Sequence, residues 1–377
     1  MRRIPCSFLE PGAEVSSHVY DNDGRILLAK GVRLTKAYIN ALVKKGIPSI
    51  YIEDDISQDI HITDVVLEET RAQASKSIKK TISSCSRLVN KDVLNLGEIK
   101  SSIFEIINQL LENKRMIYDI IDIRSIDDYL FGHSVNVCVL SLMTGISLKY
   151  SRAQLEQLAV GALLHDIGKA LVPPSILNKP GILTQDEFQE IKKHPEYSLE
   201  LLRKNSSIDS VSRIIAFEHH EKFNGEGYPV GKGGKDLLDM SQIVGMVDMY
   251  DAITSNRCYR EGLPPNEAYE LLAGSGDSFF KYEIVLAFLS KVAAYPTGTV
   301  VELNTNQIAI VLSNVGNYPL TPLVRVLLEP DGSVAAPQVE LNLIGQIKIV
   351  IKRVLNESEV RKIVNLIKDS NTTKARL

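Results

Sequence analysis

Histidines are concentrated in the middle of this chain. Five of the seven lie between positions 133 and 220, each beside polar or glycine-rich residues; they are His133, His165, His194, His219 and His220. His165 is followed directly by Asp166 in ALLHDIGKA, and VDMYDA supplies Asp248 and Asp251 further along. Neutral imidazole and carboxylate together suit divalent iron, manganese or zinc. These residue types therefore predict a metal centre.

A single histidine is more often a satisfied core or surface group than a ligand, and we keep that reading for His18 and His61, which lie outside the block. For the clustered set this reading is weak. The set contains no cysteine, whereas structural zinc sites usually include thiolates, so it suits a catalytic centre with open positions for water and substrate. A pair such as His165 and Asp166 can serve two metals, because a carboxylate can bridge two ions while its imidazole neighbour binds one.

The bulk composition describes an ordinary globular protein of two or three domains, with 377 residues and 44% hydrophobic side chains. Its 43 basic and 46 acidic side chains form no sustained basic face, which argues against binding of a long nucleic acid. The four cysteines show no CxxC pair and read as reduced thiols. MRRIPCSFLEPG lacks the apolar stretch of a signal peptide, and no run is long enough to span a membrane, so we expect a cytoplasmic protein.

The elements that must position the histidines fall into four segments, giving a multidomain α+β protein. Residues 1–60 alternate short apolar runs, such as RILLA and SIYIE, with turns, and predict a small β-rich domain. Residues 61–124 predict a helical connector, with apolar residues at helical spacing from Ile103 to Leu111. Residues 125–295 are rich in helix patterns, and residues 296–377 predict a strand-rich extension with a terminal helix. Thr184, with Glu187 three residues later, predicts a capping box.

Three segments together, LLHDIGK, HHEKFNGEGYP and VDMYDAITSNRCYR, resemble the HD-GYP family of HD-domain metal-dependent phosphohydrolases. The HD pair is His165-Asp166, and GYP is read at Gly227, Tyr228 and Pro229. The resemblance covers about residues 125–290. It implies an all-helical catalytic domain with a two- or three-metal centre, iron or manganese, that hydrolyses the bacterial second messenger cyclic di-GMP to the linear dinucleotide pGpG or to GMP.

Carried over by position, the resemblance implies seven metal ligands: His133, His165, Asp166, His194, His219, His220 and Asp248. Asp166 would be the bridging carboxylate. Some family members add a third metal through a glutamate four residues before the first histidine. Tyr129 occupies that position here, so we predict two divalent metal ions. A dimetal centre would activate water for direct attack on the phosphodiester and clamp the phosphoryl oxygens.

Other residues are expected on the substrate side. Lys169, one helical turn after His165, would stabilise phosphate or protonate the leaving oxygen, and its alternative is a solvated lysine at a helix end. Arg257 and Arg260 match basic residues that the family places on the phosphates; the alternative for both is a surface salt bridge. Tyr228 offers a hydroxyl and a ring face. Asp127 and Asp251 are expected to orient ligands or to contact substrate.

Three departures from the family pattern keep alternatives open. Ser198 stands where glycine is common, Asn224 where aspartate is common, and FFKYEIV at 279–285 replaces Phe-Asp-Pro. None removes a ligand. The main reading is a cyclic di-GMP phosphodiesterase. The alternatives are a low-turnover cyclic di-GMP sensor that acts through protein contacts, with a signalling partner or a second copy of itself, and a hydrolase of another cyclic dinucleotide or nucleotide.

Overall fold

The computed structural model describes residues 1–20, 25–62, 64–85, 96–113, 117–119, 129–179, 181–255, 262–314, 316 and 318–374. The chain divides into two compact units. One consists of Met1–Asp64, Arg115–Asp128 and Val292–Leu377, and the other of Val65–Lys114 and Tyr129–Lys291. Within the described part of the chain, no helix combines the length and the apolar character needed to cross a membrane.

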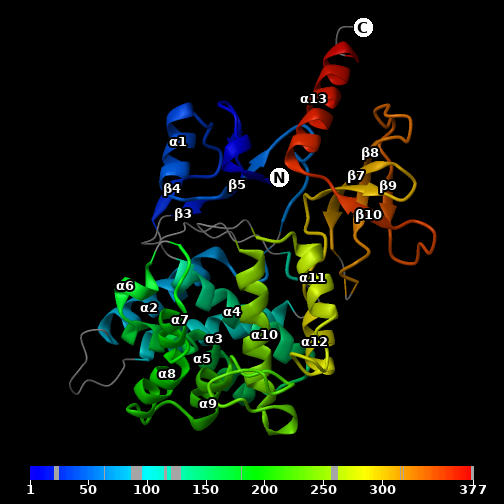
Figure 1. Cartoon of the computed structure of the whole chain (residues 1–377). Coiled ribbons are helices and arrows are strands. Elements are labelled where there is room, and N and C mark those ends of the chain that lie inside the picture. Colours follow the sequence, from blue (N-terminus) through cyan, green and yellow to red (C-terminus); the bar gives the residue numbers. More distant parts are fainter. Residues whose placement is uncertain are drawn as a thin grey trace. The chain divides into compact units, whose positions relative to one another are not determined.

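The unit that carries the histidines is built from helices (Figure 1). Its α-helices are α2 (Glu68–Cys85), α3 (Gly97–Glu112), α4 (Tyr129–Ser147), α5 (Arg152–Leu164), α6 (Pro174–Leu177), α7 (Gln185–Ile191), α8 (His194–Arg203), α9 (Ser210–Glu218), α10 (Asp239–Thr254), α11 (Pro265–Ala273) and α12 (Tyr282–Leu289). Two 3-10 helices, η3 (Ile167–Leu171) and η4 (Gly234–Asp236), connect them. The expected connector thus contributes α2 and α3 to the same compact unit as the histidines.

Local sequence signals account for several of these helices. The Thr184 hydroxyl accepts from the backbone N–H of Glu187, and the Glu187 carboxylate accepts from the N–H of Thr184, so the predicted capping box of α7 is confirmed. A second box, made by Ser151 and Gln154, starts α5. In α3 the apolar residues recur on one face and are buried, including Ile103. Each fully buried aliphatic side chain of this kind contributes about 1.5–3 kcal/mol.

The N-terminal part of the other unit contains strands and one helix. An antiparallel sheet has the order β1-β5-β2, formed by Arg2–Pro5, Ser49–Glu53 and Glu14–Val15, and β3 (Val19–Tyr20) pairs with β4 (Ile26–Leu28). The strand predicted from SIYIE is β5 itself. A short 3-10 helix, η1 (Cys6–Phe8), follows β1. The helix α1 (Lys36–Lys44), capped by the Thr35 hydroxyl, was not predicted by the strand-and-turn pattern.

The C-terminal part has a five-stranded antiparallel sheet in the order β10-β6-β7-β8-β9. Its strands are β6 (Val300–Leu303), β7 (Ile308–Ser313), β8 (Leu323–Leu328), β9 (Glu340–Asn342) and β10 (Ile351–Val354), followed by α13 (Glu357–Lys374). Alternate side chains face opposite sides of a strand. Val300 accordingly joins a core cluster that includes Ile363 of α13, whereas Val301 joins a separate cluster on the other face. Strand-containing regions therefore lie at both ends of the chain.

Candidate metal centre

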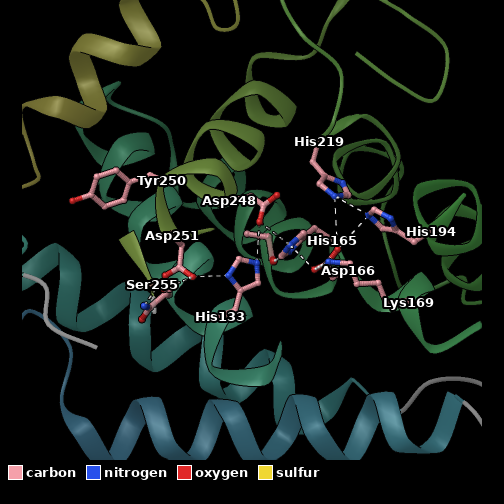
Figure 2. Close-up of polar contacts among 12 residues, drawn as sticks. His133, His165, Asp166, Lys169, His194, His219, Asp248, Tyr250, Asp251 and Ser255 are labelled. Carbon is pink, nitrogen blue, oxygen red and sulfur yellow. Dashed lines mark hydrogen bonds and ion pairs between the residues drawn. The ribbon is translucent and has the colours of Figure 1, made fainter. Parts of the chain in front are cut away.

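All seven residues expected as metal ligands lie in the helical unit, and most of them occupy helix ends. His165 ends α5 and is followed by Asp166 and η3; His194 begins α8; and His219 ends α9, with His220 directly after it. His133 and Asp248 lie inside α4 and α10. Figure 2 shows that the side chains of His133, His165, Asp166, His194, His219 and Asp248 converge on one region from these separate elements.

Three imidazoles are oriented by the same local device, a hydrogen bond to the backbone carbonyl three residues earlier. The Nδ1···O distances are 2.7 Å for His165 and Ala162, 2.7 Å for His194 and Ile191, and 3.0 Å for His219 and Ala216. A carbonyl only accepts, so each Nδ1 carries the proton and each Nε2 keeps its lone pair. These Nε2 atoms are therefore prepared to bind a cation.

Asp166 lies between the histidines. Its Oδ1 is 3.3 Å from the Nε2 of His194 and 3.9 Å from the Nε2 of His219, and its Oδ2 is 3.3 Å from the Nε2 of His165. The ammonium of Lys169 donates to the same Oδ2 at 2.5 Å. The carboxylate therefore presents one oxygen to each side of the cluster, as a bridging ligand must.

The donor atoms fit a divalent cation. The Nε2 atoms of His194 and His219 are 3.3 Å apart, although neither carries a proton for the other. Two nitrogen ligands about 2.1 Å from one ion lie roughly 3.0–3.4 Å from each other. Within the described structure, the buried Nε2 of His165 and Oδ1 of Asp166 have no hydrogen-bond partner. Buried polar atoms without a partner are costly, and a bound cation would satisfy them.

The ligand atoms form overlapping groups that lie within 4.8 Å of one another. The groups are Asp166 with His194, His219 and His220; His133 with His165 and Asp166; and His165 with His219 and Asp248. The first two share Asp166 and have no imidazole in common. The third group takes one imidazole from each of these two and adds Asp248.

His133 is held between two carboxylates from α10. Its Nε2 is 2.9 Å from Oδ1 of Asp248, and its Nδ1 is 2.6 Å from Oδ2 of Asp251. Burial alone would lower the pKa of His133, but the two carboxylates raise it to about 9. Asp251 is itself buried and lies beside the His133 ring in Figure 2. Of the two roles expected for Asp251, these contacts favour orientation of a ligand over contact with substrate.

The pKa values of His219, His220 and Asp166 are shifted toward the protonation states that metal binding requires. Burial and the neighbouring imidazoles, His220 foremost, hold the pKa of His219 well below its usual range, and burial lowers the pKa of His220 to about 3. Burial alone would raise the pKa of Asp166, but Lys169 and His165 hold it well below its usual range. Neutral imidazoles and ionised carboxylates are the forms that bind metal ions.

The glycine-rich turn after the paired histidines folds back onto them. The ring of Tyr228 stacks on that of His220, with centroids 4.6 Å apart, and the Lys192 ammonium is 5.1 Å from the Tyr228 centroid. Burial and nearby carboxylates raise the pKa of Tyr228, which keeps its hydroxyl protonated. A Cβ on Gly227 would lie 2.4 Å from the Cα of Glu221, so only glycine allows this approach.

Two glutamates flank the paired histidines, and sequence reasoning missed both. The carboxylate of Glu221, which is 2% exposed, accepts from the backbone N–H groups of Val230, Gly231 and Lys232. The carboxylate of Glu218 accepts from the Lys232 ammonium at 2.8 Å. The sequence shows only that glutamates flank the paired histidines in the run Glu-His-His-Glu at 218–221; their burial, which makes donors necessary, comes from the structure.

Some expected residues cannot be placed. Asp127, Arg257 and Arg260 lie outside the described residues, as does the side chain of Tyr129. The substrate contacts expected of these residues stay predictions. The number of two metal ions, expected because Tyr129 replaces a glutamate, also stays a prediction.

The departures from the family pattern have local roles. The Ser198 hydroxyl accepts from Gly168 N–H at 2.9 Å and donates to the His165 carbonyl at 3.0 Å, which ties α8 to the HD turn. The Asn224 side chain accepts from the N–H of Glu226 at 3.0 Å and so closes a turn. Neither contact disturbs the ligand groups.

The chain is similar to a known domain family and to known phosphodiesterases. Residues 115–283 match the model of the HD domain, and residues 300–363 match a KOW domain associated with the HD domain. A cyclic di-GMP phosphodiesterase of Pseudomonas aeruginosa is 32% identical over 64% of this chain and 59% of its own length. One of Thermotoga maritima is 31% identical over 57% of this chain and 55% of its own length.

A Vibrio cholerae relative has a different named substrate. It is a 3'3'-cGAMP-specific phosphodiesterase, 37% identical over 41% of this chain and 33% of its own length. This chain thus spans less than two thirds of the length of each of these three relatives. The matched HD domain covers all seven candidate ligands. Over residues 115–283 the chain is therefore similar to HD-domain proteins, and the resemblance of its motifs to the HD-GYP family is confirmed.

Proposed function

We propose that the chain hydrolyses cyclic di-GMP to pGpG or GMP through a dimetal centre. The observation that carries this proposal is the position of Asp166, whose two oxygens face separate groups of imidazoles. The names of the Pseudomonas and Thermotoga relatives support the substrate. The ligand set of nitrogen and oxygen atoms without thiolate supports iron or manganese as the metal.

The candidate ligands would hold two divalent ions, which would supply a water acidic enough to attack at neutral pH and positive charge for the phosphoryl oxygens. The residues of the chain do the rest. The rings of His165, His194 and His219 are fixed before substrate arrives by their hydrogen bonds to backbone carbonyls, so they need no reorganisation during the reaction.

Among the described residues, Lys169 supplies an ammonium group beside the candidate ligands that is available to act on the substrate. Its ammonium is bonded to Asp166, and its side chain keeps 24% of its surface exposed. It would hold a phosphoryl oxygen or give a proton to the leaving oxygen. The Tyr228 ring borders the same cluster through its stacking on His220 and supports a contact with the dinucleotide. Arg257, Arg260 and Asp127 are proposed as further substrate contacts on the resemblance alone.

A second candidate substrate is 3'3'-cGAMP, because the Vibrio relative specific for it is 37% identical over the matched segment. The ligand groups serve either phosphodiester equally. The low-turnover sensor, with a signalling partner or a second copy of this chain, stays a further candidate. A cytoplasmic location is proposed, since cyclic dinucleotides are made and used inside cells.

The test is a turnover assay on the full chain purified without oxygen and loaded with Mn²⁺ or Fe²⁺. Cyclic di-GMP and 3'3'-cGAMP are supplied separately, and the products are followed by chromatography. We expect pGpG or GMP from cyclic di-GMP at the higher kcat/KM. Tight binding without product would support the sensor, and faster turnover of 3'3'-cGAMP would replace the proposed substrate. The absence of bound metal in the loaded protein would overturn the proposed centre itself.

A further inference from the structure

A series of hydrogen bonds joins the start of the helical unit to His133. Arg71, in α2, donates from Nε to the Val66 carbonyl at 3.3 Å and from Nη1 to Oδ1 of Asn136 at 3.2 Å. Val65 is the first residue of this unit, and Asn136 lies in α4, one turn after His133. Arg71 therefore holds the entering backbone and the ligand-bearing helix at once.

The chemistry of the neighbours fixes the amide of Asn136. Its Nδ2 donates to Oδ1 of Asp251 at 3.0 Å. Guanidinium groups only donate and carboxylates only accept, so a single amide orientation satisfies both Arg71 and Asp251. Asn136 and Asp251 are 3% and 4% exposed, which means that water cannot easily replace either partner. With Arg71 in place, the Asn136 amine must point at the carboxylate.

The second oxygen of Asp251 completes the series. Its Oδ2 accepts from Nδ1 of His133 at 2.6 Å, and the opposite ring nitrogen of His133 lies 2.9 Å from Asp248 (Figure 2). Oδ1 of Asp251 thus accepts from Asn136, and Oδ2 accepts from His133, a metal-ligand candidate; the Ser255 hydroxyl also lies 3.5 Å from Oδ2. Rotation of the Asp251 carboxylate would turn the His133 ring away from Asp248.

We propose that Arg71 is a positioning residue of the metal centre, acting through the Asn136 amide and the Asp251 carboxylate on the ring of His133. This inference rests on the proposed function, because it assigns His133 as a ligand. Groups that orient a ligand commonly change metal affinity about 10–100-fold when removed. Arg71 acts from further away, so we expect about a tenfold effect, at the lower end of this range.

The test uses the full chain, prepared metal-free and titrated with Mn²⁺ by calorimetry. Arg71→Met keeps the aliphatic stem and removes both donations, and Asn136→Ala removes the middle of the series. Each variant should weaken Mn²⁺ binding about tenfold. The double variant should be no weaker than the Asn136 variant alone, because residues that act in series are not additive. Thermal unfolding of the metal-free forms monitors the fold.

Gln109 provides a matched control. Its Oε1 accepts from Leu67 N–H at 2.8 Å, and its Nε2 donates to Thr70 at 2.9 Å, so it too makes two bonds to the entering segment. In the described structure these bonds do not lead to Asn136. Gln109→Met should therefore leave Mn²⁺ affinity within about twofold, even where it lowers the unfolding temperature as much as Arg71→Met does.

The outcomes separate the two proposals. A wild-type chain that binds no Mn²⁺ would overturn the metal centre before Arg71 is tested. Wild-type affinity in Arg71→Met, an equal loss in the Gln109 variant, or additive losses in the double variant would overturn the role of Arg71. Should Arg71→Met fail to fold, Arg71→Lys takes its place. This variant keeps the positive charge on a single nitrogen, and its Mn²⁺ binding is expected to weaken nearly as much as the tenfold expected of Arg71→Met. Full affinity in the lysine variant would show a charge effect and refute positioning.

Discussion

Replacement of Glu221 by glutamine tests whether its carboxylate holds the turn over the candidate site. Val230 donates to Oε1 at 2.7 Å, Lys232 donates to Oε2 at 3.0 Å, and Gly231 lies 3.1 Å from both oxygens. Glutamine has nearly the same shape but offers one acceptor. Whichever oxygen is replaced by the amide NH₂ group, two of these four contacts then bring a backbone N–H against another N–H donor.

The size of the effect follows from those contacts. A hydrogen bond to a charged acceptor contributes about 1.5–3 kcal/mol, and a buried donor left unpaired costs a similar amount. The substitution removes the negative charge of the acceptor from every one of these hydrogen bonds. It also leaves at least one backbone N–H facing the amide NH₂ group instead of an acceptor. We therefore expect local opening of the turn to become easier by about 3 kcal/mol. That is a factor of about 10² in the opening equilibrium.

Amide hydrogen exchange measures this equilibrium directly. In the Glu221→Gln variant, amides of the peptide covering 228–234 should exchange about 10² times faster, while those of α5 stay unchanged. Glu226→Gln is the matched control, since Glu226 lies in the same turn but is exposed. Exchange at 228–234 within about threefold of wild type would mean that other contacts hold the turn, and the bracing role of Glu221 would be wrong.

Three further predictions follow from the same geometry. His165→Ala should lose bound metal and activity together while circular dichroism shows a retained fold; full metal stoichiometry in that variant would contradict the ligand assignment. Gly227→Ala forces a Cβ to 2.4 Å from the Glu221 Cα, so kcat/KM should fall at least about tenfold with metal still bound. In the metal-free protein, urea unfolding should show maximal stability near pH 6.5. The pKa of His133 is raised to about 9, so its stabilisation is lost as pH rises from 6.5 through 9, and the pKa of His220 is lowered to about 3, so its contribution is lost as pH falls from 6.5 toward 3. Stability that rises between pH 7 and 9 would contradict this assignment.

Elements with strong local signals were predictable from the sequence, and elements that depend on tertiary pairing were not. The short apolar run SIYIE, bounded by turns, was enough to predict the strand that the structure shows as β5. By contrast, β9 (Glu340–Asn342) has largely exposed side chains, so no hydrophobic pattern marks it, and its pairing with β8 alone defines it. The helix α1 buries only Leu42 among its residues, which leaves little helical periodicity to read.

The candidate site divides in the same way. Residue types and motifs were enough to name the histidines and Asp166, because few other functions explain imidazoles beside a carboxylate in that number. The role of Glu221 was out of reach, since it depends on the path of the backbone at 230–232, nine to eleven residues later. A glutamate in a polar segment is ordinarily read as solvated, and burial reverses that reading.

The positions of the histidines on their helices explain why they need different supports. His165, His194 and His219 lie at or next to helix ends, where the last carbonyls have no intrahelical partner and are free to accept from Nδ1. His133 lies inside α4, where the carbonyls of the preceding turn are used by the helix itself. Its Nδ1 must find an acceptor elsewhere, and Asp251 supplies one from α10. A buried carboxylate in turn requires its own donors. Asn136 donates to Asp251, and Arg71 donates to Asn136. The longer series of polar contacts at His133 is therefore a consequence of placing one candidate ligand in the middle of a helix.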